Sequence, residues 1–198
     1  LAAARRSIRR YLPIPIAREL IDSLLETAVT AASAHNRQPW RFPVIETTAA
    51  KEKLARAMGE RLRADRSRDG DSAEAIDADV ARSYARLTGA PVLIVICMSM
   101  IDMDRYADDK RNQAERLMAT QGAAMAAQNL LLAAHAAGLG ACWMCAPLFC
   151  QDTVSTALEL PCDWEPQAII TLGYSADQGK PFRRRPLSEV ARYEKGEP

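Results

Sequence analysis

A chain of 198 residues with 48% hydrophobic and 26% charged side chains has the composition of a globular protein, and one domain spanning residues 1–198 is expected. The 26 Lys and Arg nearly balance the 25 Asp and Glu, so the net charge of +1 excludes bulk attraction to nucleic acid or to an anionic membrane surface. No apolar run reaches the roughly 18 residues of a membrane-spanning helix and no signal core follows the basic start, so a cytoplasmic protein is expected. The chain begins at Leu1 instead of Met, which leaves its natural start open.

The first half of the chain predicts two helices, a short strand and a mobile region. Residues 13–32 carry apolar side chains at helical spacing, and residues 47–64 continue helically from a threonine that suits a helix cap. Between them, residues 40–46 predict a short strand in which Pro43 indicates an edge or a bulge. Residues 65–87 are the most charged and least periodic, which predicts an exposed, mobile loop followed by a helix.

The second half predicts buried strands around one long helix. The continuous apolar run 90–100 is typical of a central strand, and residues 167–174 repeat the pattern. Residues 114–137 predict a long helix that ends before Gly138, and its many small residues suit close packing or a subunit interface. Residues 141–147 predict a strand and residues 151–160 a short helix, so the fold class is α+β.

The five cysteines include a C-x-x-C pair, Cys142 and Cys145, which raises the alternatives of a zinc site or a redox dithiol. A second ligand pair at similar spacing is missing from the sequence, so no metal is expected. Strand alternation would direct Cys142 and Met144 to one face and Trp143 and Cys145 to the other, which keeps the thiols apart. We therefore predict plain core or pocket-lining thiols. His135 lies in the alanine-rich helix and is expected to be structural.

Three polar segments offer groups suited to a ligand. The segments 5–10 (RRSIRR) and 182–186 (FRRRP) present guanidinium forks and a serine hydroxyl, which suit a phosphate. The segment 35–40 (HNRQPW) contains Asn36 and Gln38, whose carboxamides can read a heterocycle that displays donors and acceptors. Together they predict a nucleotide-like ligand, although each alone also fits a solvated surface or a self-bonded turn. The sequence has no G-x-G-x-x-G, no P-loop and no Ser-His-Asp or Cys-His set, so catalytic side chains stay unassigned.

Four motifs in order, RRSIRR, AASAHNRQPWRF, QNLLLAAHAAGLGACWM and GYSADQGKPFRRRPLSEV, give the chain a resemblance to the FMN-dependent nitroreductase family from residue 5 to about residue 190. The segment LPCDWEPQAIITLGY is similar to the branch that includes the nitroreductase-like domain associated with deazaflavin coenzyme biosynthesis. The resemblance implies an α-β-α sandwich with a mixed, mostly antiparallel sheet flanked by helices. It also implies a homodimer with FMN, tightly but non-covalently bound, at each of two subunit interfaces.

By the same resemblance, residues of this chain correspond to the family's FMN contacts. The N-terminal segment supplies Arg5, Arg6, Ser7 and Arg9, and Arg185 or Arg183 corresponds to the C-terminal arginine at the phosphate. The family's loop beside the ribityl chain and ring, contributed by the other subunit, corresponds to Ser33, Asn36 and Gln38. The family's strand that passes the flavin ring corresponds to Trp143, Met144, Cys145 and Ala146. Some family members have Glu-Gly where this chain has Cys145-Ala146, so a thiol is expected near the ring.

The activity implied is that of an NAD(P)H-dependent FMN oxidoreductase. Hydride from NADH or NADPH would be passed by a ping-pong mechanism to a small-molecule acceptor, such as a nitroaromatic or a quinone, because the cofactor carries the redox chemistry. Two alternatives stay open: a reductase in deazaflavin coenzyme biosynthesis, and a non-catalytic FMN-binding module. The variable segments expected to select the acceptor are residues 65–90 and 100–115.

Overall fold

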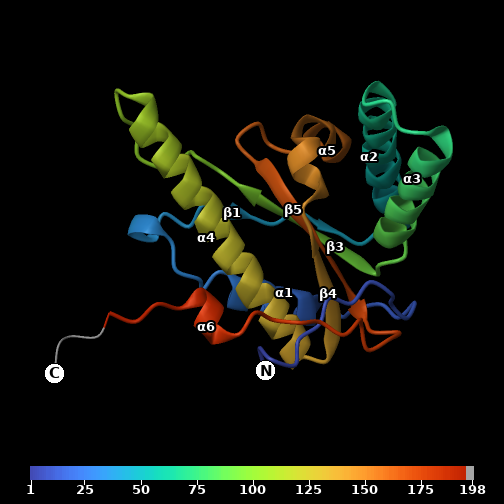
Figure 1. Cartoon of the computed structure of the whole chain (residues 1–198), viewed down its shortest axis with the longest axis horizontal. Coiled ribbons are helices and arrows are strands. Elements are labelled where there is room, and N and C mark those ends of the chain that lie inside the picture. The colour runs from blue at the N-terminus through green and yellow to red at the C-terminus, as the bar shows by residue number, and fades with distance from the viewer. Residues whose placement is uncertain (195–198) are drawn as a thin grey trace.

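A five-stranded antiparallel sheet forms the centre of the computed structural model, which describes residues 1–194 (Figure 1). The last four residues of the predicted 1–198 domain lie outside the described part. The strand order is β1-β3-β5-β4, with β2 also pairing with β3, and every ladder is antiparallel. The bounds are β1 Trp40–Arg41, β2 Val44–Ile45, β3 Val92–Met98, β4 Leu139–Met144 and β5 Glu165–Tyr174.

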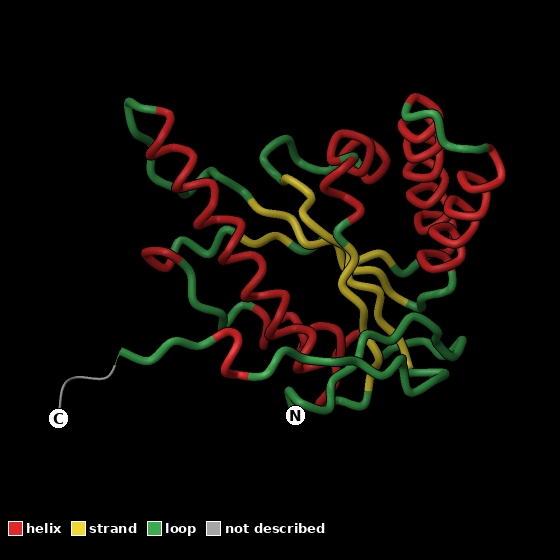
Figure 2. The backbone as a smooth tube through the Cα atoms, viewed as in Figure 1, coloured by secondary structure: helices red, strands yellow, loops and turns green. Residues whose placement is uncertain are grey.

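Helices cover both faces of the sheet, as Figure 2 shows by the red segments around the yellow strands. One face carries α1 (Arg18–Ala28) and α4 (Asp109–Ala136), and the other carries α2 (Thr48–Arg68) and α5 (Gln151–Leu158). The helix α3 (Ala73–Thr88) packs against α2. Short 3-10 helices, η1 (Ala34–Asn36) and η2 (Ala146–Phe149), and α6 (Leu187–Val190) complete the described elements. This is the expected α-β-α sandwich.

The alternation of side chains along β3 explains why the run 92–98 is apolar throughout. Val92, Ile94 and Ile96 face α1 and α4, whereas Leu93 and Val95 face α2 and α5. All seven residues of β3 are buried, because a strand with helices on both faces has no solvent side. The predicted central strand is therefore confirmed.

Within residues 65–87 the predicted helix is confirmed as α3, but the predicted loop before it is too long, because α2 continues to Arg68 and α3 begins at Ala73. Ion pairs that join the two helices stabilise this hairpin, including Arg63 with Asp77 and Arg66 with Asp79. Close packing of Gly59 against Val80 brings the helices together. Of α3 only Ile76 and Leu87 are buried, so its apolar stripe is narrow and the helical signal in the sequence is weak there.

The remaining predicted elements are confirmed with shifted ends. The strand expected over 40–46 is divided into β1 and β2 around Pro43, and α2 is capped by Thr47 as expected. The strand expected to reach Pro147 ends at Met144, since η2 begins at Ala146. Gly138, with φ of 75°, follows α4 as the expected left-handed residue. Within residues 1–194, no helix is long and apolar enough to cross a bilayer.

Candidate functional site

The N-terminal arginine segment, residues 5–10, lies along the edge of β4. Ser7 forms a parallel bridge with Ala141, and the backbone N–H of Ile8 donates to Ala141 O at 3.0 Å. The Ile8 side chain is buried against Gly140, where a Cβ atom would lie 2.7 Å from Ile8 Cγ2. Only a glycine lets the segment approach so closely, and this approach places Arg5, Ser7 and Arg9 beside the strand.

The phenol of Tyr11 holds the far end of the segment. Its oxygen lies 2.6 Å from Ile8 O and 2.6 Å from Thr171 Oγ1, which belongs to β5. Burial raises the pKa of Tyr11 above its ordinary value, so the phenol stays protonated and can donate. The segment is thus fixed to two neighbouring strands.

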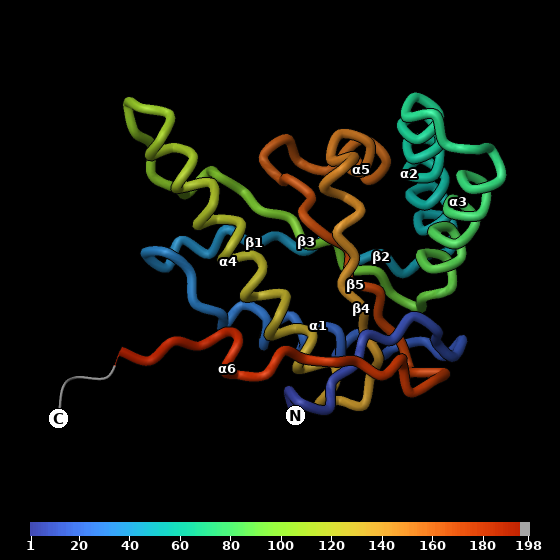
Figure 3. Tube along the Cα trace, viewed as in Figure 1, coloured from blue at the N-terminus to red at the C-terminus, as the bar shows by residue number. Residues whose placement is uncertain are grey.

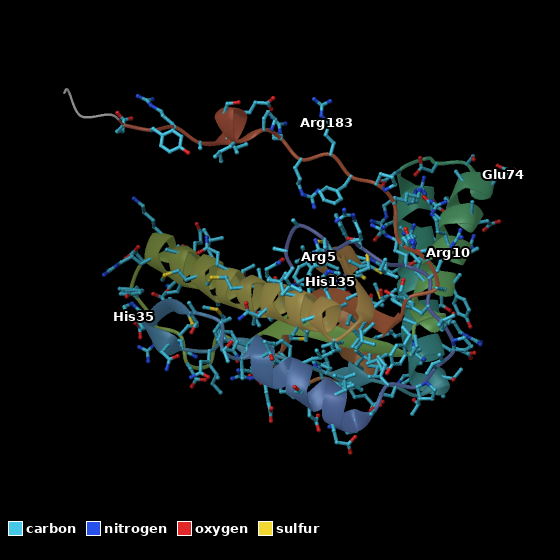
Figure 4. The ribbon with its side chains drawn as sticks, turned by 90° about the horizontal axis from the view of Figure 1, so that it is seen from below. Arg5, Arg10, His35, Glu74, His135 and Arg183 are labelled. Atoms are coloured by element: carbon cyan, nitrogen blue, oxygen red, sulfur yellow. The ribbon has the colours of Figure 1, made fainter. Side chains whose placement is uncertain are left out.

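Two hollows open on the arginine segment. The Arg5 cavity measures about 250 Å³ and is lined mainly by the segment, the end of α4 and the start of β4, with Arg5, Arg6, His135, Gly138 and Gln178 among its residues. Figure 4 shows Arg5 and His135 next to each other there. The second, which we call the basic hollow, measures about 630 Å³ and is lined chiefly by Ser7, Arg9, Arg10, Arg82, Arg86, Asp177 and Lys180.

The C-terminal tail passes the arginine segment, as the red and blue tubes of Figure 3 show. The ring of Phe182 is flanked by the guanidinium carbons of Arg6, 4.0 Å from its centroid, and Arg184, 3.9 Å away. Arg183 and Arg185 are exposed, and Arg185 lies 3.7 Å from the Glu189 carboxylate. Figure 4 shows Arg183 directed away from the body of the molecule. The structure therefore brings the tail to the segment, but neither of these two arginines lines the Arg5 cavity.

The polar loop before β1 has an unusual backbone. His35, Asn36 and Gln38 all have positive φ values, of 49°, 55° and 50°. Such left-handed residues other than glycine are uncommon, and they persist at functional sites where the surroundings hold them. Here the Ser33 hydroxyl oxygen accepts the Gln38 N–H at 3.0 Å, and Pro39 is buried near Gly122 of α4.

The side chains of Asn36 and Gln38 are exposed, and among residues 1–194 neither carboxamide forms a hydrogen bond. The loop contacts α4 at Gly122, whereas the Arg5 cavity borders α4 at His135. At about 1.5 Å per residue, these two positions are roughly 20 Å apart along the helix. Within one chain, Ser33, Asn36 and Gln38 therefore lie apart from Arg5, Arg6, Ser7 and Arg9.

The end of β4 carries the C-x-x-C pair. Cys142 is buried and Cys145 is exposed, and the Trp143 indole N–H donates to Cys145 Sγ at 2.7 Å. Burial raises the pKa of the Cys97 thiol to about 12 and raises that of Cys142, so both are inert thiols at neutral pH. Ala146 opens η2, so its backbone N–H has no partner within that helix. Among residues 1–194, no three His, Cys, Asp or Glu side chains converge as metal ligands would.

Three cations of the basic hollow escaped the sequence analysis, Arg82, Arg86 and Lys180, whereas Arg10 lies in the predicted segment 5–10. The i, i+4 spacing of Arg82 and Arg86 places both on one face of α3, which was a usable signal. What the sequence did not show is that α3 faces the arginine segment. His135, expected to be structural, lies in the wall of the Arg5 cavity.

Comparisons with known proteins identify the family of the chain. The model of the nitroreductase family matches residues 2–174. An NADH dehydrogenase of Thermus thermophilus is 29% identical, with 96% of this chain and 92% of the relative aligned. A 5,6-dimethylbenzimidazole synthase of Rhodospirillum rubrum is also 29% identical, over 95% of this chain and 83% of the relative.

Among solved structures, one from Desulfovibrio desulfuricans, described as a nitroreductase in complex with FMN, superimposes with a TM-score of 0.74. It is 29% identical and covers 98% of this chain and 94% of its own. Since the family model spans most of the chain and the sandwich fold is shared, this chain belongs to the nitroreductase family.

Proposed function

We propose that the protein is an FMN-dependent oxidoreductase that takes hydride from NADH or NADPH and reduces a nitroaromatic, a quinone or a related acceptor in a ping-pong cycle. Family membership supports the reaction class, and the FMN in the Desulfovibrio structure supports the cofactor. The observation that carries the proposal is the docking of the arginine segment along β4, which brings cationic side chains to the strand that ends at Met144 and leads into Cys145 and Ala146.

The residues present fit FMN chemically. Arg5 and Arg6 line the Arg5 cavity, and their guanidinium groups suit a phosphate. Arg183 or Arg185 would join this phosphate site when the C-terminal tail closes over the cavity. Ser7 and Arg9 are further hydrogen-bond donors, and both line the basic hollow. The carboxamides of Asn36 and Gln38, which form no hydrogen bond among residues 1–194, match the mixed donors and acceptors of a heterocycle edge. Trp143, Cys145 and the Ala146 N–H, which has no partner within η2, are the groups we assign to the ring.

FMN, when bound, supplies two-electron transfer between the nicotinamide and the acceptor. The nicotinamide loses a hydride to become NAD(P)⁺, and the acceptor gains the two electrons with protons from water. This chain's residues bind and orient the reactants, and the cations of both hollows favour negative charge near the site. No catalytic side chain is assigned.

We also propose that the active form is a homodimer. Asn36 and Gln38 lie apart from the arginine segment within one chain, so a second chain is needed to bring the two sets to one ligand. Apolar side chains stay exposed on α4 and on the tail, at Leu117, Met125, Leu187, Val190 and Tyr193. An obligate interface of this kind typically buries more than ~2,000 Å².

Mixing two inactive variants should therefore restore FMN binding. A chain with Arg5→Ala and a chain with Asn36→Ala are each expected to bind FMN weakly. The two variants are unfolded, mixed and refolded together. About half of the resulting dimers should be heterodimers, and in each of these one of the two sites has both Arg5 and Asn36. About a quarter of all sites should therefore recover in a two-fold symmetric dimer. Dilution should likewise yield no FMN-bound monomer. If the refolded mixture binds FMN no better than the two variants do separately, the site is not shared between subunits. A monomer that holds FMN at micromolar concentration would contradict the shared site as well.

The two thiols at the end of β4 should respond differently to substitution. Cys145→Ser changes the exposed sulfur that accepts the Trp143 N–H, so we expect a modest change in flavin reactivity or acceptor preference and little loss of stability. Cys142→Ser buries a hydroxyl among core groups and should lower the free energy of unfolding by about 1–3 kcal/mol. Urea unfolding and turnover of both variants check this. Loss of turnover in both, or stoichiometric zinc in the purified protein, would favour a dithiol or metal site instead.

Steady-state kinetics test the proposed function itself. The FMN-loaded protein is assayed with NADH and with NADPH against a panel of nitroaromatics and quinones, and parallel double-reciprocal lines are expected. If flavin is bound and neither nicotinamide is oxidised with any acceptor, the protein is a flavin-binding module and the enzymatic proposal is wrong.

A further inference from the structure

The basic hollow holds more positive charge than the proposed FMN site requires. Besides Arg9, which we assign to FMN, its lining includes four cations, Arg10, Arg82, Arg86 and Lys180, and a single carboxylate, that of Asp177. The Asp177 carboxylate accepts the Gly179 N–H at 2.9 Å, so it also serves to order its own turn. The FMN phosphate, which is one group, is already matched by the forks of the Arg5 cavity.

The cations of the basic hollow are largely free to bind a ligand. Within residues 1–194, Arg9, Arg10, Arg86 and Lys180 form no ion pair, and only Arg82 has one, with Asp79. Arg86 is half-buried, whereas Arg9, Arg10 and Lys180 are exposed at the rim. An unpaired guanidinium that is partly removed from water gains most from an anion that supplies both charge and acceptor oxygens.

The neighbouring acidic side chains are occupied elsewhere. On the α2/α3 hairpin, Asp65, Asp71, Asp77 and Asp79 all form ion pairs with arginines of the same hairpin. On the side of α3 that faces the basic hollow, Arg82 has Asp79 as its counter-charge, whereas Arg86 has none among residues 1–194. Arg86, Arg9, Arg10 and Lys180 are therefore the cations that a ligand anion can neutralise.

We propose that the basic hollow binds the 2′-phosphate of NADPH and so selects NADPH over NADH as the reductant. This inference rests on the proposed function, which requires one of the two nicotinamides. They differ by a single phosphate monoester, and arginine is the side chain that accommodates that group in other nucleotide sites. A hollow of about 630 Å³ that shares Ser7 and Arg9 with the arginine segment has room for part of a second nucleotide beside the first.

The test compares the two nicotinamides in the FMN-loaded protein and in two rim variants, Arg10→Ala and Lys180→Ala. In the parent, kcat/KM should be higher for NADPH than for NADH. Each variant should lower the NADPH value by about tenfold, the worth of one charge-assisted hydrogen bond, with a much smaller change for NADH. Binding of NADP⁺, followed by the flavin absorbance change at equilibrium, should weaken by the same factor, and inorganic phosphate should compete with NADP⁺ more than with NAD⁺.

Matched controls are Arg18→Ala and Lys53→Ala, exposed cations that line neither hollow and lie outside both segments expected to select the acceptor, so they should leave the NADPH to NADH ratio unchanged. An unchanged ratio in both rim variants, while the protein still turns over, would overturn the inference and leave the proposed function intact. Weaker binding of FMN but not of riboflavin in Arg10→Ala would also overturn it, because the hollow would then hold the phosphate of FMN itself. Absence of turnover with either nicotinamide would instead sink the proposed function.

Discussion

Gly140→Ala is expected to disrupt both the stability of the fold and the binding of FMN. The new Cβ would lie 2.7 Å from Ile8 Cγ2 and 2.8 Å from Ile8 Cβ, so the buried Ile8 side chain must move. Overpacking of this kind typically costs about 1–3 kcal/mol. Because Ile8 lies between Ser7 and Arg9, its displacement pulls the arginine segment off β4. Urea unfolding and FMN titration of the variant measure the two effects separately.

Gly138→Ala is the matched control for this substitution. Gly138 has φ of 75° and no atom within 4 Å of an added Cβ, so it reports the backbone strain alone. Adding Ile8→Ala to Gly140→Ala removes the two Cγ contacts at 2.7 and 3.0 Å but keeps the Cβ contact at 2.8 Å, so it should recover only part of the FMN affinity. FMN binding that survives Gly140→Ala unchanged would show that the segment's contact with β4 does not form the cofactor site.

Arg5→Ala is expected to weaken FMN binding by tenfold to about a hundredfold. Arg5 lines the Arg5 cavity, where we place the phosphate, and a hydrogen bond to a charged group is worth roughly 1.5–3 kcal/mol. Riboflavin lacks the phosphate, so its affinity should be the same in the parent and the variant. Equilibrium titration with each flavin provides the comparison.

The same titration on Arg183→Ala and Arg185→Ala identifies which tail arginine completes the phosphate site. Both are exposed in the single chain, so a loss of FMN affinity in either variant would show that the tail closes when FMN or a second chain binds. Arg105→Ala serves as a surface control. If riboflavin affinity falls as far as FMN affinity in Arg5→Ala, the residue does not contact the phosphate.

Much of the fold is predictable because its signals are local. The run 92–98 is apolar at every position since both its faces are covered, and the small residues of α4 mark a helix that packs closely. The loop between α2 and α3 was predicted too long because the hairpin is stabilised by ion pairs, such as Arg66 with Asp79, and by the close packing of Gly59 against Val80. Neither leaves an amphipathic pattern in the sequence.

The candidate site was predictable only where its residues lie in one short segment. Arg5, Ser7 and Arg9 are neighbours in the sequence, and their types alone suggest a phosphate. Arg86 reaches the same region from α3, and Tyr11 fixes the segment through Thr171, 160 residues away in the chain. The left-handed backbone at Asn36 and Gln38 was equally hidden, because neither residue requires it by its type.

The most direct test of the account is an anaerobic titration of the FMN-reconstituted protein after removal of free flavin. We expect one FMN per subunit, bleaching of the flavin absorbance by one equivalent of NADPH, and its return when a quinone or nitroaromatic is added, since the cofactor carries the redox chemistry. A protein that retains no flavin after reconstitution with excess FMN, or whose bound flavin is bleached by neither NADPH nor NADH, would contradict it.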